Sequence, residues 1–258
     1  MELDETQLSP VAKSRLDQLL VARGLAQSRE RARALLLAGH VDGNGVRVTK
    51  AGTLVDEAAA ITIRQPDHPC VGRGGIKLAH SQDEFHLDVT GLTALDIGAS
   101  TGGFTDVLLQ RGAARVVALD VGHNQIDWRL RQDPRVVCLE GVNARYLRPE
   151  ALPDGLRAFD LITIDVAFIS LSQIFPVVPA VLAPHGRVIA LVKPQFEAGK
   201  ADVGSGGIVR DPAIHARVLD EVTAAAVQVG LTRVALTPSP VTGAEGNVEF
   251  LLLLSRQP

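Results

Sequence analysis

The sequence predicts an α/β protein, with a mostly parallel β-sheet covered by helices on both faces and a small α+β module in front of it. Three observations predict this fold. From residue 77 onward, short apolar runs typical of buried strands alternate with helical stretches. A glycine-rich turn, 98–103, follows the first of these runs. The last two runs, 233–237 and 248–254, are joined by a segment too short for a helix, so we expect this pair to be antiparallel.

Composition sets the outer bounds. The chain has 258 residues, 46% hydrophobic and 21% charged, which is typical of a soluble globular protein with one large or two smaller domains. No apolar run reaches the roughly 18 to 20 residues that a membrane helix needs, and the acidic N-terminus is unlike a signal peptide. The two cysteines, Cys70 and Cys138, match no metal-binding spacing. We therefore expect a reduced, cytoplasmic protein without a metal.

The charge is unevenly distributed along the chain. Residues 13–50 contain eight lysines and arginines against three acids, a net charge of +5, whereas the whole chain carries −3. Residues 51–258 carry −5. A compact basic module on an acidic body favours binding of a polyanion.

The basic module shows its own order of elements. Apolar residues at helical spacing predict a helix over 13–23, which Gly24 ends. Ser28 is a candidate N-cap for a second helix. Short strand-like runs follow at 40–42, 46–48 and 60–63, with a glycine-rich turn at 43–45.

This order resembles the S4 RNA-binding domain over about 50 residues, from RLDQLLVARGLAQSRERARALLLAGHVDGNGVRV onward. The resemblance implies that helix residues and the following strand face structured RNA. His40 stands where the family often has lysine or arginine. A helix pair with a solvated arginine face is the alternative. The candidate RNA-binding residues are Arg15, Arg29, Arg33, His40 and Arg47.

The larger domain is expected to begin after a linker rich in proline and glycine. We expect residues 1–64 to form the module, 65–76 the linker and 77–258 the larger domain. A helix is expected near 77–86. The expected parallel strands lie near 93–97, 115–120, 135–139, 159–165 and 186–192.

The glycine-rich turn predicts a cofactor site. A strand, a glycine turn and an acid about 20 residues on, Asp120, are typical of sites that bind a ribose. The glycines at 98, 102 and 103 differ from the G-x-G-x-x-G spacing of dinucleotide sites. Asp96 would repel a pyrophosphate and suits a cationic ligand such as S-adenosylmethionine, whose ribose hydroxyls Asp120 would bind. A dinucleotide site and a turn without a ligand are the alternatives.

Charged residues also follow two later strands. Asp165 and Lys193 each end an apolar run, and ligands of open α/β sheets bind at the carboxyl ends of the strands. Lys77 and Glu249 could reach the same edge. Each residue also has a simpler interpretation: Asp165 and Lys193 as a surface ion pair, Lys77 as a solvated helix residue, and Glu249 as a strand residue facing water.

At this point the larger domain resembles the FtsJ-like ribose 2′-O-methyltransferases, and together with the S4 module the chain resembles the TlyA (haemolysin A-like) rRNA methyltransferases. The stretches that carry the resemblance include VGRGGIKL, LDIGASTGGFTDVLLQRGA, FDLITIDVAFISL, LVKPQFEAGK and GNVEF. The resemblance implies a class I, Rossmann-like fold that uses S-adenosylmethionine. It also implies 2′-O methylation of cytidine in ribosomal RNA or ribosomal subunits, without a metal and away from membranes.

The resemblance also implies roles for individual residues. Lys193 would accept the proton of the 2′-hydroxyl, Asp165 would orient Lys193, and Lys77 and Glu249 would position the hydroxyl. Asn143 stands where FtsJ-like enzymes often have aspartate. Together with Asp96, the residues expected at the cofactor are Gly98, Ser100, Gly102, Phe104, Asp120 and Asn143.

Other functions remain open at this stage. A haemolysin-like membrane-active protein and a non-catalytic RNA-binding assembly factor are the alternatives. Methylation of cytosine C5 would need a cysteine near the site, and neither cysteine lies near Asp165 or Lys193 in the sequence. The segment 197–211 is either a loop that closes over RNA or a passive surface loop, and Asp211 is expected to cap the helix that follows. The sequence does not specify the target nucleotide, the ribosomal subunit or the oligomeric state.

Overall fold

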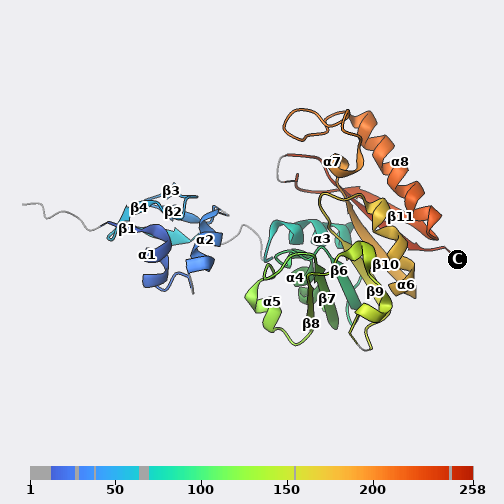
Figure 1. Ribbon diagram of the computed structural model, residues 1–258, viewed down its shortest axis with the longest axis horizontal. Coiled ribbons are helices and arrows are strands. Elements are labelled where there is room, and N and C mark those ends of the chain that lie inside the picture. The colour runs from blue at the N-terminus through green and yellow to red at the C-terminus, as the bar shows by residue number, and fades with distance from the viewer. Residues whose placement is uncertain are drawn as a thin grey trace, which may run out of the picture. The chain divides into compact units, whose positions relative to one another are not determined.

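The structure is a computed structural model that describes residues 13–26, 29–37, 39–63, 70–153, 155–243 and 246–257. The chain forms two compact units, Met1–Pro69 and Cys70–Pro258, which are drawn in Figure 1. The first part of the expected linker, 65–69, lies outside the described residues, whereas 70–76 is described.

In the described part of the N-terminal unit, the chain forms two helices and two small antiparallel sheets. Its helices are α1 (Leu16–Ala22) and α2 (Arg29–Leu37). One sheet pairs β1 with β4, and the other has the order β3-β2-β5. The strands are β1 (Lys13–Arg15), β2 (Val41–Gly43), β3 (Val46–Arg47), β4 (Leu54–Asp56) and β5 (Ile61–Ile63).

Two features of this unit differ from the expectation. Residues 13–15 were expected in the first helix, but they form β1, whose Ser14 lies opposite Val55 of β4. The sequence did not predict β4, because three residues without a clear alternation carry almost no strand signal. The expected N-cap, Ser28, lies outside the described residues. The core of the unit consists of Leu16, Leu20, Ala26, Ala32, Leu36 and Val41.

The larger unit is built on a seven-stranded sheet with the order β11-β12-β10-β9-β6-β7-β8. The strands from β10 to β8 are parallel, whereas β12 is antiparallel to both of its neighbours. The expected antiparallel closing pair is therefore confirmed. The strands are β6 (Thr93–Ile97), β7 (Arg115–Asp120), β8 (Val136–Glu140), β9 (Phe159–Ile164), β10 (Leu182–Val192), β11 (Leu231–Pro238) and β12 (Phe250–Arg256).

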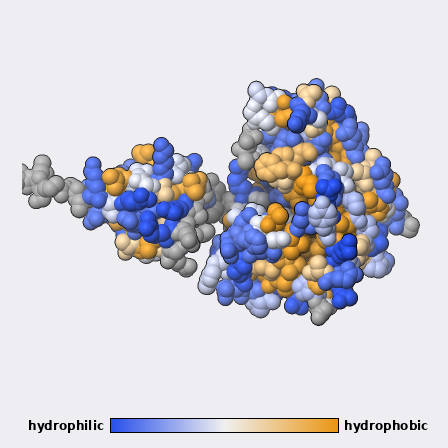
Figure 2. Space-filling view, viewed as in Figure 1, coloured by the Kyte–Doolittle hydropathy of each residue, from blue (hydrophilic) through white to orange (hydrophobic). Residues whose placement is uncertain are grey.

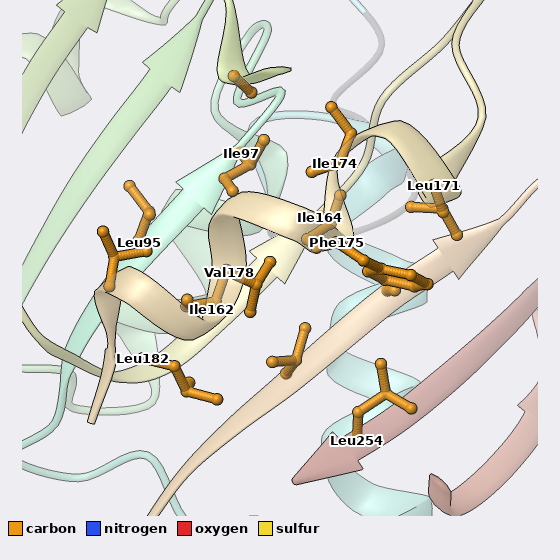
Figure 3. Packing of buried hydrophobic residues seen from close by; sticks show 14 of the residues in the cluster. Leu95, Ile97, Ile162, Ile164, Leu171, Ile174, Phe175, Val178, Leu182 and Leu254 are labelled. Carbon is orange, nitrogen blue, oxygen red and sulfur yellow. The ribbon is translucent and has the colours of Figure 1, made fainter. Parts of the chain in front are cut away.

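Helices cover both faces of this sheet (Figure 1). One buried cluster joins the sheet to α3 (Arg73–Glu84), α4 (Gly103–Gln110) and α5 (Trp128–Gln132). The opposite cluster joins it to the segment around α6 (Val178–Val181) and to α8 (Pro212–Gln228). Figure 3 shows this second cluster, in which Leu95 and Ile97 of β6 and Ile162 and Ile164 of β9 pack against Phe175 and Val178. Alternate residues of one strand thus reach opposite faces, which explains the nearly continuous apolar runs.

Two helix starts bear on the functional region. α3 begins at Arg73, within the segment expected as a linker, so Lys77 lies in the second turn of a helix. α8 begins as expected, because the Asp211 side chain accepts a hydrogen bond of 2.8 Å from the Ala213 N–H and Pro212 is the first helical residue.

Candidate active site

A cavity of about 410 Å³ lies where β6, β7 and β9 end. Asp120, the last residue of β7, lies at its edge and accepts hydrogen bonds of 2.8 Å from the Ser100 N–H and 2.7 Å from the Gly122 N–H. Apolar side chains form much of the remaining wall. They are Ile97, Leu119, Val121, Val142, Val166, Ile169 and Ile174.

The glycine turn shapes this cavity because it can accept no side chain at two positions. Gly98 has φ +82°, and a Cβ there would lie 2.3 Å from the carbonyl oxygen of Asp165. Gly102 has φ +94°, and a Cβ there would lie 2.3 Å from Leu130 Cδ1. Both conformations belong to the left-handed region that favours glycine. Gly98 lines the cavity, whereas Gly102 lies outside its lining and close to Leu130.

Asp96 corrects one of our expectations, because it does not face the cavity. Its side chain is fully buried and points to the α4 face of the sheet, where it accepts hydrogen bonds from Thr105 Oγ1 at 2.7 Å and Thr163 Oγ1 at 2.8 Å. Burial raises the pKa of Asp96 to about 6. Asp96 therefore ties β6 to α4 and β9 beneath the cavity. The sequence placed it near the ligand, but alternation along β6 turns it to the other side.

The remaining residues expected at the cofactor lie in two connected places. Ser100 and Asn143 line the main cavity, and Asn143 Oδ1 also accepts a hydrogen bond of 3.0 Å from the Arg145 N–H. Phe104 lines a smaller cavity of about 150 Å³ that Gly98, Ser100 and Asp165 share with the main one.

Two lysine–acid pairs lie at the same end of the sheet. Lys193 Nζ, directly after β10, is 2.5 Å from Asp165 Oδ1, directly after β9. Lys77 Nζ of α3 is 2.5 Å from Glu249 Oε2, directly before β12. The exposed fractions of the two lysine side chains are 11% for Lys77 and 13% for Lys193, and Glu249 is 2% exposed. Neither pair is a solvated surface pair, and Glu249 does not face water.

A second cavity of about 480 Å³ contains Lys77, Lys193 and Glu249 in its wall. Ala167 and Phe168 line both this cavity and the main one, so the two cavities adjoin at the loop that follows Asp165. Figure 2 shows apolar residues at the surface of the larger unit between the α8 region and the α5 region. The remaining lining residues are Gln195, Phe196, Val203 and Gly207.

Sequence reasoning missed three of these lining residues, Phe168, Gln195 and Phe196. Each lies within five residues of Asp165 or Lys193, in the stretches VAFISL and KPQFE. The signal that could have found Phe168 is an aromatic residue in a loop that follows a buried strand. In the structure its side chain is 91% exposed, and the centroid of its ring lies 5.0 Å from that of Phe196.

The segment 198–211 forms one wall of the second cavity through Val203 and Gly207. Asn247, which is 2% exposed, holds it in place. The Asn247 amide donates a hydrogen bond of 2.9 Å to the Gly207 carbonyl and accepts one of 3.0 Å from the Val209 N–H. This segment is therefore fastened to the residues that precede β12.

In the N-terminal unit, three of the candidate arginines surround one acid. Asp17 is fully buried, and its carboxylate lies 3.0 Å from Arg15 Nε, 3.3 Å from Arg29 Nη2 and 3.5 Å from Arg33 Nε. The hydrogen bond from Arg15 holds the pKa of Asp17 well below its usual range, against the effect of burial. The arginine side chains remain 41% to 52% exposed.

The other two candidates lie elsewhere in this unit. Arg47 of β3 is exposed and passes close to Gly39, where a Cβ would lie 3.3 Å from Arg47 Cδ. The His40 N–H donates to the Leu35 carbonyl. In the described part of the chain, neither side chain forms an ion pair with Asp17.

The described residues offer neither a metal site nor a membrane-spanning helix. They contain no group of histidine, cysteine or acidic side chains that could hold a metal ion. No helix among them is both long enough and apolar enough to cross a membrane.

The sheet with its antiparallel β12, and a glycine turn beside an acidic strand end, define the larger unit as a methyltransferase of the Rossmann-like class rather than a dinucleotide-binding domain. Residues 70–256 match the FtsJ-like methyltransferases, and residues 14–61 match the S4 domain.

Individual relatives agree with these matches. The 16S/23S rRNA (cytidine-2′-O)-methyltransferase TlyA of Mycobacterium tuberculosis is 46% identical over 246 residues, which cover 95% of this chain and 91% of the relative. Hemolysin A of Brachyspira hyodysenteriae is 41% identical over 237 residues, 92% of this chain and 98% of the relative. A solved structure from Streptococcus thermophilus, which bears a hemolysin name, has a TM-score of 0.74 at 44% identity, covering 96% of this chain and 90% of the other. The chain belongs to the FtsJ-like methyltransferase family that includes these proteins.

Proposed function

We propose that this protein transfers a methyl group from S-adenosylmethionine to the ribose 2′-hydroxyl of cytidine in ribosomal RNA. The observation that carries the proposal is the position of two mostly buried lysine–acid pairs, Lys193–Asp165 and Lys77–Glu249, at a second cavity and at its border with the glycine-turn cavity. The name of the M. tuberculosis relative describes this activity for that protein.

The main cavity fits the proposed methyl donor. Its volume of about 410 Å³ lies within the range of small-molecule sites. Asp120 would accept hydrogen bonds from the ribose hydroxyls, and Val142 and Ile174 would contact the adenine beside Asn143. The Asp165 carboxylate borders the main and the smaller cavity, where it suits a positive charge. S-adenosylmethionine would supply a methyl group bound to a positively charged sulfur.

The residues of the second cavity suit the activation of a hydroxyl. A ribose hydroxyl is a weak nucleophile until its proton is removed or strongly polarised. Lys193 would take up this proton in its neutral amine form and become an ammonium, and Asp165, 2.5 Å away, would orient the amine. Lys77, held by Glu249, would hydrogen-bond the hydroxyl oxygen from the side of α3. Holding the hydroxyl and the methyl group in line would supply much of the rate increase.

The N-terminal unit would bind the RNA. Three partly exposed guanidinium groups on Asp17 present more positive charge than this single acid balances, and a guanidinium can bind a phosphate through two parallel hydrogen bonds. Arg47 and His40 would extend the contact along the RNA. The substrate would be ribosomal RNA or a ribosomal subunit, and the protein would act in the cytoplasm.

Mass-spectrometric mapping of 2′-O-methylcytidine tests the proposal in ribosomal RNA from cells with and without the protein. We expect at least one modified cytidine that disappears without the protein, returns with the wild type and does not return with Lys193→Ala. Arg115→Ala is the control and should restore the modification, because Arg115 is exposed and lies at the start of β7, at the end of the sheet opposite the cavities. Intact ribosome binding without any modification would contradict the proposal and favour a non-catalytic assembly factor.

A further inference from the structure

The two loops that carry the reactive residues meet at one side chain that the mechanism does not use. Glu197 ends α7 (Pro194–Glu197), the short helix directly after Lys193. Its Oε2 accepts a hydrogen bond of 2.6 Å from Ser170 Oγ, and its Oε1 accepts one of 2.9 Å from the Leu171 N–H. Glu197 therefore fastens the loop after Lys193 to the loop after Asp165.

This contact reaches the start of a 3₁₀ helix, η3 (Leu171–Gln173). Ser170 Oγ also accepts a hydrogen bond of 3.1 Å from the Ser172 N–H, and the two serine hydroxyls lie 2.8 Å apart. The Leu171 side chain is buried in the core shown in Figure 3. Residues 170–172 are thus held by Glu197 on one side and by the core on the other.

Phe168 lies in the loop between Asp165 and residues 170–172. Its backbone has φ +63°, in the left-handed region that is unfavourable for a bulky residue. Its ring is 91% exposed, lies 5.0 Å from the Phe196 ring and borders both cavities. An exposed ring supplies little packing to offset an unfavourable backbone conformation, so the conformation must be held from its flanks.

Burial of Glu197 is itself unfavourable. Burial raises the pKa of the Glu197 carboxyl, although the hydrogen bonds from Ser170 and Leu171 act in the opposite direction. Partial burial of an acid is unfavourable because it desolvates a charge, whereas an apolar side chain could fill the same space without that cost. A carboxylate at this position is explained by the hydrogen bonds that it accepts from Ser170 Oγ and the Leu171 N–H.

We propose that Glu197 is a positioning residue for methyl transfer: it locks the 165–171 loop to the 193–197 loop and so holds Asp165 and Phe168 in place between the two cavities. This inference rests on the proposed function. It adds a residue that touches neither reactant and acts through the loop it fastens.

Three variants test it. Glu197→Ala removes both acceptors. Glu197→Gln keeps the shape, and its amide can still accept from the Leu171 N–H while donating to Ser170 Oγ, whose hydroxyl works in both directions. Glu221→Ala is the matched control, because Glu221 lies near Glu197 on α8 but is 59% exposed and pairs with Arg217 instead.

The first measurement needs no activity. Hydrogen–deuterium exchange of a peptide spanning 166–173 should be at least about 10-fold faster in Glu197→Ala than in the wild type, with wild-type protection in Glu197→Gln and Glu221→Ala. Equal exchange in all four proteins would overturn the proposal even if the protein does not methylate RNA.

The second measurement is the single-turnover rate of methyl transfer with both S-adenosylmethionine and ribosomal subunits saturating. We expect Glu197→Ala to lose about 10-fold or more, Glu197→Gln to recover most of the rate, and Glu221→Ala to match the wild type. A Glu197→Ala protein that is less heat-stable but transfers at the wild-type rate would show a purely structural role and overturn the inference. Failure of the wild type to transfer would instead contradict the proposed function.

Discussion

Both units of this protein place cations against buried acids, but in different proportions. In the N-terminal unit, Arg15, Arg29 and Arg33 share the single acid Asp17. In the larger unit, each lysine has its own acid, in the pairs Lys77–Glu249 and Lys193–Asp165. The arginines are about half exposed, whereas the lysines are 11% and 13% exposed.

This difference indicates separate roles: the arginines attract RNA, and the lysine–acid pairs take part in methyl transfer. A cluster with surplus positive charge at the surface attracts a polyanion over a distance of about 8–10 Å in salt. Neutral pairs at the wall of a cavity attract little, but they hold amines and carboxylates at fixed positions, as a transition state requires. We therefore predict that variants of the lysine–acid pairs change the rate of methyl transfer, whereas variants of the arginine cluster change the affinity for RNA.

The largest expected effect is that of Lys193→Ala. Loss of the proton acceptor should lower the rate of methyl transfer by about 10²-fold or more, the usual scale of general acid–base catalysis. The affinity for RNA should change far less than the rate, because Lys193 is 13% exposed and lies outside the arginine cluster that is expected to contact phosphates. Single-turnover kinetics and RNA titration measure the two quantities. A wild-type transfer rate would make Lys193 a structural residue.

Asp96 and Asp17, both fully buried, should contribute to the stability of their units with opposite dependence on pH. The pKa of Asp96 is raised to about 6, so the folded unit holds this proton to higher pH than the unfolded chain. Its contribution to stability falls as pH rises from about 4 to about 6 and stays low above that. As pH rises from 4 to 7, the free energy of unfolding of Asp96→Asn should therefore increase by up to about 3 kcal/mol relative to that of the wild type.

Asp17 should behave in the opposite way, because its neighbours are arginines and its pKa is lowered. Its contribution should be complete above about pH 4 and should be lost as pH falls further. Asp17→Asn should therefore destabilise the N-terminal unit at pH 7 and less so in acid. Denaturation at several pH values gives the free energy of unfolding of each variant relative to the wild type. If this difference changes with pH in the same direction for Asp96→Asn and Asp17→Asn, the expected contrast is refuted.

The third prediction concerns Asp120. Asp120→Ala should weaken S-adenosylmethionine binding by about 1.5–3 kcal/mol, the typical value for a hydrogen bond to a charged group. Because Asp120 also accepts from the Ser100 and Gly122 N–H groups, Asp120→Asn, which keeps one acceptor, is the companion variant. Calorimetry gives the affinities. Binding equal to the wild type in Asp120→Ala would remove the ribose contact from the account.

The smallest expected effect is that of Arg29→Ala combined with Arg33→Ala. Removal of two phosphate contacts should flatten the dependence of RNA affinity on salt by about one to two units of log–log slope. Asp17 keeps Arg15, its main partner, so this variant should remain folded. Arg217→Ala, on the larger unit, is the control. An unchanged slope would mean that the RNA contact lies elsewhere.

Most of the larger unit could be predicted from the sequence because its strands are apolar runs, and β6 to β9 end at or directly before a glycine or an acid. The antiparallel closing pair followed from the short segment that joins it. β1 and β4 could not be predicted, since they pair with each other across nearly the whole unit, Lys13 opposite Asp56, and no turn motif joins them as the glycine-rich turn joins β2 and β3.

The candidate site was partly predictable for the same reason. Asp165 and Lys193 follow buried strands, and parallel strands bring their ends together. The orientation of Asp96 depends on the alternation along β6 and on Thr105 and Thr163, which are distant in sequence. The contact of Glu197 with Ser170 spans 27 positions and leaves no local pattern.

The most direct test of the division between attraction and chemistry compares two proteins in two assays. Lys193→Ala and the Arg29→Ala, Arg33→Ala double variant are each assayed for RNA affinity at moderate salt and for single-turnover transfer at saturating RNA. We predict that Lys193→Ala loses only the transfer rate and that the double variant loses only the affinity for RNA. Loss of both quantities in either protein would contradict this prediction.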